Sequence, residues 1–475
     1  MAEREAELLE RIEQLEAEND ALRGSSGRSG SGTADSAAGL RAVVPAAGEG
    51  GAAAAGAQGG PLGGIKVLDL TQYQNGPNAT VLLGDFGAEI LKVERPGGEP
   101  GRGIGVAPGA SASSSSYLGP YFEGMNRGKK SCTLDLKQEG AREVLRRMVQ
   151  WADVLVENFK PGQMESMGYS YEVLCEWNPA IIYAANSGFG PRGEWAARGS
   201  YDAVCQGMSG WMISQGGGPS HPPCNSPHGI GDQVGSMYFA FCIVSALTAR
   251  ERFGVGQRVD CSQLGAMTQL QALGLSAALH FAKEPDHGSV GTECATACFC
   301  HYKCKDDKYL CVANAEARQW GHLCEAIGRP DLTDQFATAN DRRGPGKLMH
   351  SQLQEEVFSK RTREEWLEII PGDLTPCAPV NGMLDVTNHS QFWDNDYLVE
   401  IPYPEYEAEF GQPYKAVGCP ALFSSTPPPL PSKSAPKLGE HSVATMGELG
   451  FSAGEVEQLV AQGVITAKPA AEGKL

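Results

Sequence analysis

Residues Ser226 to Leu270 read SPHGIGDQVGSMYFAFCIVSALTARERFGVGQRVDCSQLGAMTQL, and the interpretation of the whole chain begins from this stretch. A loop rich in proline and glycine ends at Asp232, and apolar residues then recur at the spacing of a helix. The residues expected on its buried face are Met237, Tyr238, Phe241, Cys242, Val244, Ser245 and Leu247. Arg250 and Arg252 in the last turn, and Gly254 after it, are typical of a helix C-terminus.

Asp232 is expected at or just before the N-terminus of this helix, beside backbone N–H groups that have no partner within the helix. Two roles fit that place. Asp232 is either an N-cap, because aspartate is a preferred N-cap residue, or a nucleophile that the helix dipole keeps ionised. In the second role the neighbouring glycines let a bulky substrate approach. The local sequence leaves both roles open.

Composition limits the class of protein. The chain has 475 residues, 41% of them hydrophobic, so it can bury a large core in two domains or in one elaborated domain. A formal charge of −18 argues against nucleic acid as the main partner, because phosphates require clustered lysine and arginine. The longest apolar run, near residues 237–249, is too short and too polar to span a bilayer, so we expect a core helix and no membrane partner.

The fourteen cysteines are scattered and no signal peptide precedes them, which favours a reducing compartment. The densest group lies between Cys294 and Cys311 and includes His301, but it lacks paired CxxC motifs, so we predict no metal site. Residues 299–313 instead indicate two strands around the turn at 305–308. The acidic N-terminus does not resemble an arginine-rich presequence. A cytoplasmic or mitochondrial location is expected, without a clear targeting signal.

The N-terminal sixty residues differ from the rest of the chain. Residues 1–24 predict a short charged, coiled-coil-like helix, with Leu8, Leu15 and Leu22 on one heptad position. This helix is either solvated or a small zipper in which Asn19 favours a parallel dimer, and the pattern leaves both open. Residues 25–60 are glycine, alanine and serine with few large apolar side chains, which predicts a disordered linker.

Strands and helices alternate after residue 61. The expected strands are Ile65–Leu70, Glu89–Glu94, Thr133–Leu136, Asp153–Asn158 and Ala180–Ala185. The expected helices between them are Ala79–Gly87, Glu139–Ala152 and one that ends near Trp177. This alternation predicts an α/β fold with a Rossmann-like, mostly parallel sheet. Ligands of such sheets bind at the carboxyl ends of the strands, so the loops after the predicted strands are the places to search for a site.

The motifs in those loops resemble the class III CoA-transferases, the formyl-CoA and carnitine CoA-transferase group, whose superfamily includes α-methylacyl-CoA racemase. The Gly231-Asp232 step and the turn TARERFGVGQRVD at residues 248–260 resemble the segment that carries the family's catalytic aspartate. Further resemblances lie in the first loop (69–77), the K-x-E-x-P-G turn (92–98), the N-R-x-K-R-S segment (126–131) and the V-E-N-F-x-P-G motif (156–162). The resemblance covers about residues 62 to 466.

The resemblance implies a transfer of coenzyme A between carboxylic acids through an aspartyl anhydride and an aspartyl-CoA thioester on Asp232, with Gln74 beside the reacting thioester. It also implies contacts of coenzyme A with Arg95, Asn158, Phe159 and Tyr201. The family commonly has an arginine where this chain has Ser166, and Lys160 is the expected substitute. Coenzyme A is then a substrate, and no metal or redox cofactor is required. The donor and acceptor acids stay open.

Two alternatives are weighed against the transferase. A racemase-like enzyme would use a Gly-His-Asp triplet, but this chain has Ser200-Tyr201-Asp202, and tyrosine is a poor base near neutral pH with a pKa of about 10. An inactive scaffold that has kept the fold is the second alternative, and the intact Gly231-Asp232 step counts against it.

The resemblance also implies the domain order. Residues 61–285 are expected to form a large CoA-binding α/β domain and residues 286–400 a smaller α+β domain. Residues 401–475 are expected to return the chain to the large domain, because the segments around Ser425 and Leu438 match the family's closing T-P and L-G-E-H motifs. Family subunits interlock as dimers, so a homodimer is expected.

Overall fold

The computed structural model of the chain describes residues 59–104, 119–282, 296–338, 341–342 and 346–467. They belong to one compact unit that comprises residues 55–475. The helix predicted for residues 1–24 and nearly all of the linker predicted for residues 25–60 lie outside the described residues, and both stay predictions.

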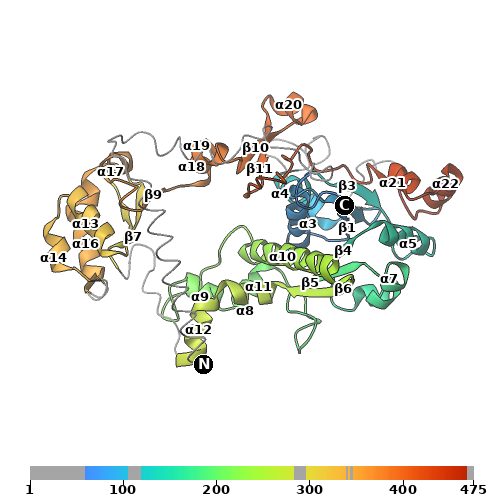
Figure 1. Ribbon diagram of the computed structural model, residues 1–475, viewed down its shortest axis with the longest axis horizontal. Helices are drawn as coiled ribbons and strands as arrows, with labels where there is room; N and C mark the ends of the chain where they lie inside the picture. The colour runs from blue at the N-terminus through green and yellow to red at the C-terminus, as the bar shows by residue number, and fades with distance from the viewer. Residues whose placement is uncertain (1–58, 105–118, 283–295, 339–340, 343–345, 468–475) are drawn as a thin grey trace, which may run out of the picture. The chain divides into compact units, whose positions relative to one another are not determined.

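A six-stranded parallel sheet forms the centre of the fold, with the strand order β3-β2-β1-β4-β5-β6 (Figure 1). Its strands are β1 (Lys66–Asp69), β2 (Glu89–Glu94), β3 (Lys130–Thr133), β4 (Val154–Glu157), β5 (Ile182–Ser187) and β6 (Gln257–Ser262). Every pair of neighbours in this sheet runs parallel. The prediction of an α/β fold with a mostly parallel, Rossmann-like sheet is therefore confirmed, since this is the order of doubly wound nucleotide-binding sheets.

Two strand predictions need correction. The strand expected at Thr133–Leu136 begins earlier, because Lys130 to Thr133 pair with β2 and the chain leaves the sheet at Leu134. Leu134 was included in the predicted strand because it is apolar, but its side chain is buried in the core beyond the end of the strand. β6 was read only as a charged turn, since Val259 and Cys261 are its only hydrophobic residues. It pairs with β5 over six residues and forms the edge of the sheet.

Helices cover both faces of the sheet, because successive side chains of β1 are buried in different clusters. Val67 packs into the cluster that contains Phe239, and Leu68 packs into the cluster on the opposite face that contains Leu145. The first face is covered by α3 (Asn75–Asp85) and α10 (Ile230–Phe253). The second is covered by α5 (Ala141–Trp151), α7 (Tyr171–Trp177), α21 (Ser442–Glu448) and α22 (Ala453–Ala461).

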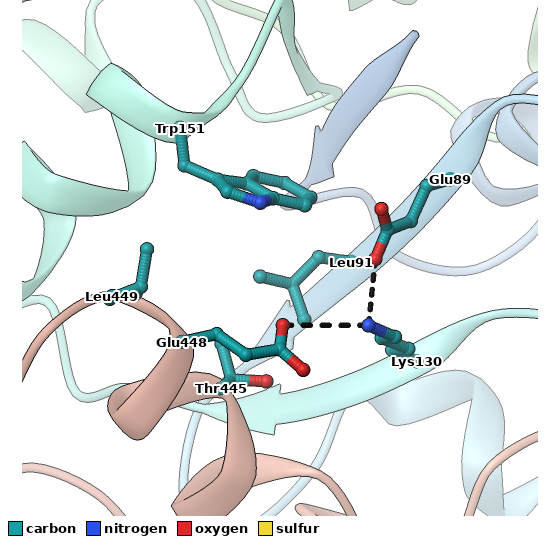
Figure 2. Close-up of a pocket in the computed structure, with 7 residues that line it drawn as sticks. All are labelled: Glu89, Leu91, Lys130, Trp151, Thr445, Glu448 and Leu449. Atoms are coloured by element: carbon teal, nitrogen blue, oxygen red, sulfur yellow. Dashed lines mark ion pairs between the residues drawn. The ribbon is translucent and has the colours of Figure 1, made fainter. Parts of the chain in front are cut away.

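The C-terminal segment packs on the large sheet beside β3 and α5 (Figure 1). Asp135 N donates to Val464 O at 2.9 Å, so the last described residues are tied to the chain after β3. Figure 2 shows the contact of α21 with the sheet, where Lys130 Nζ lies 2.7 Å from Glu89 Oε1 and 3.5 Å from Glu448 Oε2. Trp151 and Leu449 fill the rest of this pocket, which has no room for a ligand.

The buried face of α10 agrees with the predicted one at Leu247, and at Val244 in part, but differs elsewhere. Met237 and Phe241 are 56% and 66% exposed. The buried residues are Gly231, Gly235, Ser236, Phe239, Ala240, Ile243, Ala246 and Leu247. This face is richer in small residues, which lets α10 approach α3 and the sheet closely. By length and composition alone α10 could cross a membrane, but it packs on β5 and β6 as a core helix.

A second, antiparallel sheet has the order β7-β8-β9 and its own core around Tyr302, Trp320 and Phe358. Its elements are β7 (Phe299–Lys303), β8 (Tyr309–Ala313), β9 (Cys377–Val380), α13 (Ala317–Ala326), α14 (Asp331–Gln335), α16 (Gly346–Glu356), η2 (Phe358–Lys360) and α17 (Arg363–Ile369). The β7–β8 hairpin lies where the sequence predicted two strands around a turn. The predicted domain limits at residues 285 and 400 stay predictions.

Two helices follow β6, namely α11 (Gln263–Leu270) and α12 (Ala272–Phe281). The remaining elements are η1 (Pro100–Gly103), α4 (Pro120–Asn126), α6 (Gln163–Ser166), α8 (Asp202–Met208), α9 (Trp211–Gln215), α18 (Met383–Asn388), α19 (Ser390–Trp393), β10 (Leu398–Ile401), α20 (Pro404–Phe410) and β11 (Tyr414–Val417). β10 and β11 pair antiparallel as a separate hairpin.

Candidate active site

The strand order reverses between β1 and β4, and the loops after these two strands are joined to each other. Gln72 N donates to Asn158 Oδ1 at 2.8 Å, and Asn158 Nδ2 donates to Gln72 O at 2.8 Å. The carboxyl ends of strands at such a reversal form the usual ligand crevice of a doubly wound sheet. Asn158, which the V-E-N-F motif assigns to coenzyme A binding, therefore lies at the expected edge and fixes the first loop there.

Gln74 and the start of α10 lie against each other. Gln74 precedes α3, and its Nε2 donates to His228 O at 3.3 Å. Gly229 has a φ of 70°, and a Cβ there would lie 2.7 Å from Gln74 Nε2. Only glycine combines this backbone conformation with so close an approach. The structure thus brings Gln74 to the loop that starts α10, three residues before Asp232.

Asp232 is the third residue of α10 and lies half-buried in its first turn. The N-cap position belongs to Gly229, which has no side chain to cap the helix, so the N-cap role proposed for Asp232 is wrong. Asp202 supplies the missing acceptor from α8. Its Oδ1 accepts from the backbone N–H of Gly231 at 2.7 Å and of Asp232 at 3.2 Å. A Cβ at Gly231 would lie 2.9 Å from this oxygen, which explains the glycine before Asp232.

The pKa of Asp232 is raised to about 7. Burial is the largest cause, and the negative charge of Asp202 adds to it, whereas the hydrogen bond from Gln263 acts in the opposite sense. The helix N-terminus therefore does not keep the pKa of Asp232 at its usual low value in the unliganded chain. Burial of the carboxyl is the main physical reason, and Asp202 adds its negative charge and also occupies the helix N–H groups that were expected to stabilise the charge of Asp232.

Three amide side chains that the sequence analysis did not single out surround Asp232. Gln263 Nε2 donates to Asp232 Oδ1, and Asn75 Nδ2 donates to the backbone oxygen of Asp232 at 3.5 Å. Asn186 Nδ2 in turn donates to Asn75 Oδ1. Gln263 directly follows β6, so the expectation that ligands bind at the carboxyl ends of parallel strands would have pointed to it if β6 had been recognised as a strand.

Two tyrosines form one wall of the site. Tyr73 has a φ of 64°, a conformation that costs energy for a residue with a side chain, and its ring meets that of Tyr201 edge-on at 5.9 Å between centroids. A hydrogen bond between Tyr73 and Tyr201 is the largest cause that raises the pKa of Tyr73. Tyr201, which the resemblance assigned to coenzyme A binding, is 67% exposed and is thus accessible to a ligand.

Tyr121 of α4 is a further candidate that sequence reasoning missed. Burial and the charge of Asp232 are the first two causes that raise the pKa of its phenol above the usual range. The phenol therefore stays protonated at neutral pH and is a hydrogen-bond donor in the electric field of Asp232. No motif pointed to Tyr121, because its link to Asp232 is purely spatial.

Buried charges hold the loop that carries Tyr73 and Gln74. Tyr73 N donates to Glu99 Oε2 at 2.9 Å, and Lys92 Nζ lies 3.3 Å from Glu99 Oε1. Lys92 Nζ also donates to Thr71 O at 2.9 Å. Lys92 and Glu99 are 0% and 4% exposed. Lys92 of the K-x-E-x-P-G motif and Glu99, which follows the motif, therefore form a buried ion pair that supports the loop.

The remaining predicted coenzyme A residues are not all in contact with one another. Phe159 packs partly into the core, and its backbone N–H donates to Glu157 Oε2 at 2.6 Å. Lys160 is exposed, and its Nζ lies 3.9 Å from the position of a Cβ at Gly199, near Tyr201. Arg95 is exposed in the turn after β2, where its Nε donates to Gly98 O at 2.7 Å. Within the described residues, no hydrogen bond joins Arg95 to the other four coenzyme A candidates.

The part of the chain that the structure describes holds no group of three or more histidine, cysteine, aspartate or glutamate side chains arranged to bind a metal ion. Cys298 and Cys304 of the cysteine-rich segment are buried in the core around the β7–β8 hairpin, and Cys294 lies outside the described residues.

Comparisons with known proteins agree with the order of the motifs. The model of CoA-transferase family III matches residues 62–442. A succinyl-CoA:mesaconate CoA-transferase of Haloarcula marismortui is 33% identical over 399 residues, which are 83% of this chain and 98% of the relative. A formyl-CoA:oxalate CoA-transferase of Streptomyces coelicolor is 33% identical over 422 residues, with 85% and 99% of the two chains covered.

Solved structures show the same fold. A CAIB/BAIF family protein from Brucella suis superposes with a TM-score of 0.69 at 31% sequence identity and covers 82% of this chain and 100% of its own. A hypothetical protein from Mycobacterium tuberculosis superposes with a TM-score of 0.69 at 29% identity, with 82% and 99% of the two chains covered.

Proposed function

Because the chain belongs to CoA-transferase family III, and is thus an enzyme that transfers coenzyme A, we propose that it works through covalent intermediates on Asp232. The relatives described above act on carboxylic acids such as mesaconate and oxalate, and we extend this class of acceptor to this chain. The observation that carries the proposal is the half-buried Asp232 carboxyl in the first turn of α10, whose preceding loop accepts a hydrogen bond from Gln74.

A carboxylate nucleophile suits the energetics of this reaction. A serine would give an oxygen ester, which lies well below a thioester in free energy, whereas a carboxylate gives an anhydride that is at least as activated. Each later step then stays reversible. The donor acyl-CoA and Asp232 form the anhydride and release CoA thiolate, and the thiolate returns to give an aspartyl-CoA thioester. The acceptor carboxylate repeats the exchange in reverse.

The tetrahedral intermediates carry an oxyanion that needs hydrogen-bond donors. Gln74 Nε2 contacts the loop that starts α10, and the Tyr121 phenol is held protonated near Asp232. We assign these two side chains to the oxyanion formed on the substrate. The binding of coenzyme A is assigned to Arg95, Asn158, Phe159, Lys160 and Tyr201.

The racemase alternative is not favoured, because the named relatives are CoA-transferases. Asp202, the candidate acid or base of that reaction, also has its carboxylate engaged by two backbone N–H groups and by Gln206 Nε2 at 2.6 Å. A 2-methylacyl-CoA incubated with the enzyme in deuterium oxide is expected to show no enzyme-dependent exchange at its α-carbon.

We also propose that the enzyme is a homodimer. Apolar side chains of α10 and α12 are each more than half exposed in the single chain: Met237, Phe241, Leu273, Leu279 and Phe281. Soluble monomers seldom expose so many large apolar side chains, so a second subunit is expected to cover them. Light scattering should give a dimer, and Phe241→Asp with Leu279→Asp should give monomers.

The test of the covalent mechanism is Asp232→Asn, which keeps the shape of the side chain and removes the nucleophile. We expect coenzyme A affinity to survive and transfer to fall by several orders of magnitude, with Asp373→Asn, an exposed loop aspartate, as the matched control. Hydroxylamine added during turnover should label a peptide that contains Asp232. A variant that transfers at the wild-type rate would end the mechanism.

A further inference from the structure

Gln263 is the first residue of α11 and is 6% exposed. Its carboxamide lies between two groups of opposite hydrogen-bonding character. Nε2 donates to Asp232 Oδ1, while Oε1 accepts from Ser200 Oγ and from Cys205 Sγ, both at 3.5 Å. Because hydroxyl and thiol donors face one end of the amide, the N–H end faces the carboxylate.

The two oxygens of Asp232 are therefore different. Oδ1 is held by Gln263, whereas within the described ranges of the chain no hydrogen bond reaches Oδ2. The backbone N–H groups at the helix start do not reach either oxygen, because Asp202 Oδ1 accepts them. Oδ2 is thus the oxygen with lone pairs free for attack.

We propose that Gln263 is a further catalytic residue, which holds Oδ1 of Asp232 as the carbonyl oxygen of the covalent intermediates and leaves Oδ2 as the nucleophile. This inference rests on the proposed function and adds a residue to it.

The chemistry follows from which oxygen is held. An electron pair of Oδ2 attacks the thioester carbonyl carbon, the C–S bond breaks, and the thiolate leaves with the electron pair. Oδ2 is then the bridging oxygen of an anhydride, and Oδ1 is the carbonyl oxygen on Cγ of Asp232. When the thiolate attacks Cγ, negative charge develops on Oδ1, to which the Gln263 N–H already points.

The intermediate then collapses as the bond between Cγ and Oδ2 breaks. The donor acid leaves as a carboxylate that carries Oδ2, and Asp232 becomes the CoA thioester. The acceptor carboxylate later attacks the same carbon, and charge again develops on Oδ1. A donor fixed in advance toward developing charge is the arrangement of an oxyanion hole. Gln263 thus serves the oxyanion on the enzyme, whereas Gln74 and Tyr121 serve the one on the substrate.

The test compares Gln263→Met, an unbranched side chain of similar length without a donor, with Gln233→Met. Gln233 follows Asp232 on the same helix turn, and its Oε1 accepts a hydrogen bond from Asn78 Nδ2 at 2.9 Å. Gln233→Met therefore removes a hydrogen bond between two side-chain amides without changing a contact of the Asp232 carboxyl. Aspartate labelled with ¹³C at Cγ, with the Asp232 signal identified from Asp232→Asn, reports the pH midpoint of Asp232 in each protein. Transfer is then measured about two pH units above each midpoint.

For Gln263→Met we expect a midpoint raised by about one pH unit, since a hydrogen bond to the charged form is lost. We also expect a transfer rate about 100-fold lower even where Asp232 is fully ionised, at unchanged coenzyme A affinity. Gln233→Met should keep the wild-type midpoint and rate. If Gln263 had a packing role alone, its substitution would lower the melting temperature without both raising the Asp232 midpoint and lowering the transfer rate at full ionisation.

Two results would overturn the inference: an unmoved midpoint, or a wild-type rate of Gln263→Met once Asp232 is ionised. If Gln263→Met does not fold, Gln263→Leu gives the same comparison. If Asp232→Asn abolishes transfer but Gln263→Met leaves the transfer rate unchanged, only this inference is overturned. A wild-type chain that transfers no coenzyme A would overturn the proposed function and this role with it, whatever the titration shows.

Discussion

The carboxylate of Asp202 accepts a hydrogen bond from the backbone N–H of Asp232 at 3.2 Å, so two acidic side chains meet at the N-terminus of α10. The partial positive charge of the helix end stabilises the charge of Asp202, and not that of Asp232. Burial and the Asp202 charge together raise the pKa of Asp232 to about 7. The ionisation of the proposed nucleophile therefore depends on a second carboxylate that lies 30 residues earlier in the chain.

This pair predicts the pH dependence of the enzyme. Transfer requires ionised Asp232, so kcat/KM should fall as the pH drops through about 7. Asp202→Asn keeps an oxygen that can accept from the helix N–H groups but removes the negative charge. The acid limb should therefore move to lower pH by about one unit. A pH–rate profile of both proteins measures it, and a limb that stays in place or moves upward would contradict this account.

The hydrophobic patterns of the sequence predicted much of the sheet. Runs of apolar residues separated by helical segments identified β1, β2, β4 and β5, and the rule that ligands bind after parallel strands selected the loops of Gln74 and Asn158. β6 could not be recognised in this way, because this edge strand has no run of apolar residues and only Val259 and Cys261 are hydrophobic. Its strand conformation depends on pairing with β5, a contact that distant residues supply.

The errors at α10 have the same origin. Met237 and Phe241 were placed inside because they are apolar, yet the face with Gly235 and Ser236 is buried, since only small side chains let α3 lie so close. The charge state of Asp232 was inferred from its own helix alone. Beside burial, Asp202 raises the pKa of Asp232 and Gln263 lowers it, from 30 and 31 residues away, and no local pattern reveals such partners.

The contact between α10 and Asn75 predicts the effect of one added methyl group. A Cβ at Gly235 would lie 2.1 Å from Asn75 Nδ2, whose side chain is buried and hydrogen-bonded to Asn186 and Asp232. Gly235→Ala should therefore destabilise the fold by about 1–3 kcal/mol and lower transfer, although alanine is the better helix former. Denaturant unfolding and kcat measure both effects.

Gly447→Ala is the matched control, because this helical glycine in α21 has no atom within 4 Å of an added Cβ. It should be neutral or stabilise the protein by up to about 1 kcal/mol. If Gly235→Ala behaves like Gly447→Ala, the close approach of Asn75 has no energetic weight.

The buried pair of Lys92 and Glu99 predicts a separation of stability from activity. Glu99→Ala leaves the Lys92 charge without this partner and should cost about 3 kcal/mol of stability. The double variant Lys92→Met/Glu99→Leu should regain much of that stability, because neither member of the pair is then left buried without the other. Both should have a lowered kcat, since Tyr73 N has lost its acceptor. Melting curves and kcat of the three proteins test this, and a double variant with wild-type kcat would show that Glu99 does not hold the catalytic loop.

The raised pKa of Asp232 also predicts that the proposed nucleophile destabilises the fold. Above about pH 3.8 the carboxyl of the unfolded chain loses its proton, whereas the folded one keeps it until about pH 7, so stability is lost as the pH rises through this window. Asparagine does not titrate. Asp232→Asn should therefore be more stable than wild type by about 4 kcal/mol at about pH 8, and by about half as much at about pH 5. Melting temperatures at both pH values measure this, with Asp373→Asn as the control. Equal curves at about pH 8 would mean that Asp232 ionises without cost, and a less stable variant would restore a capping role for its carboxylate.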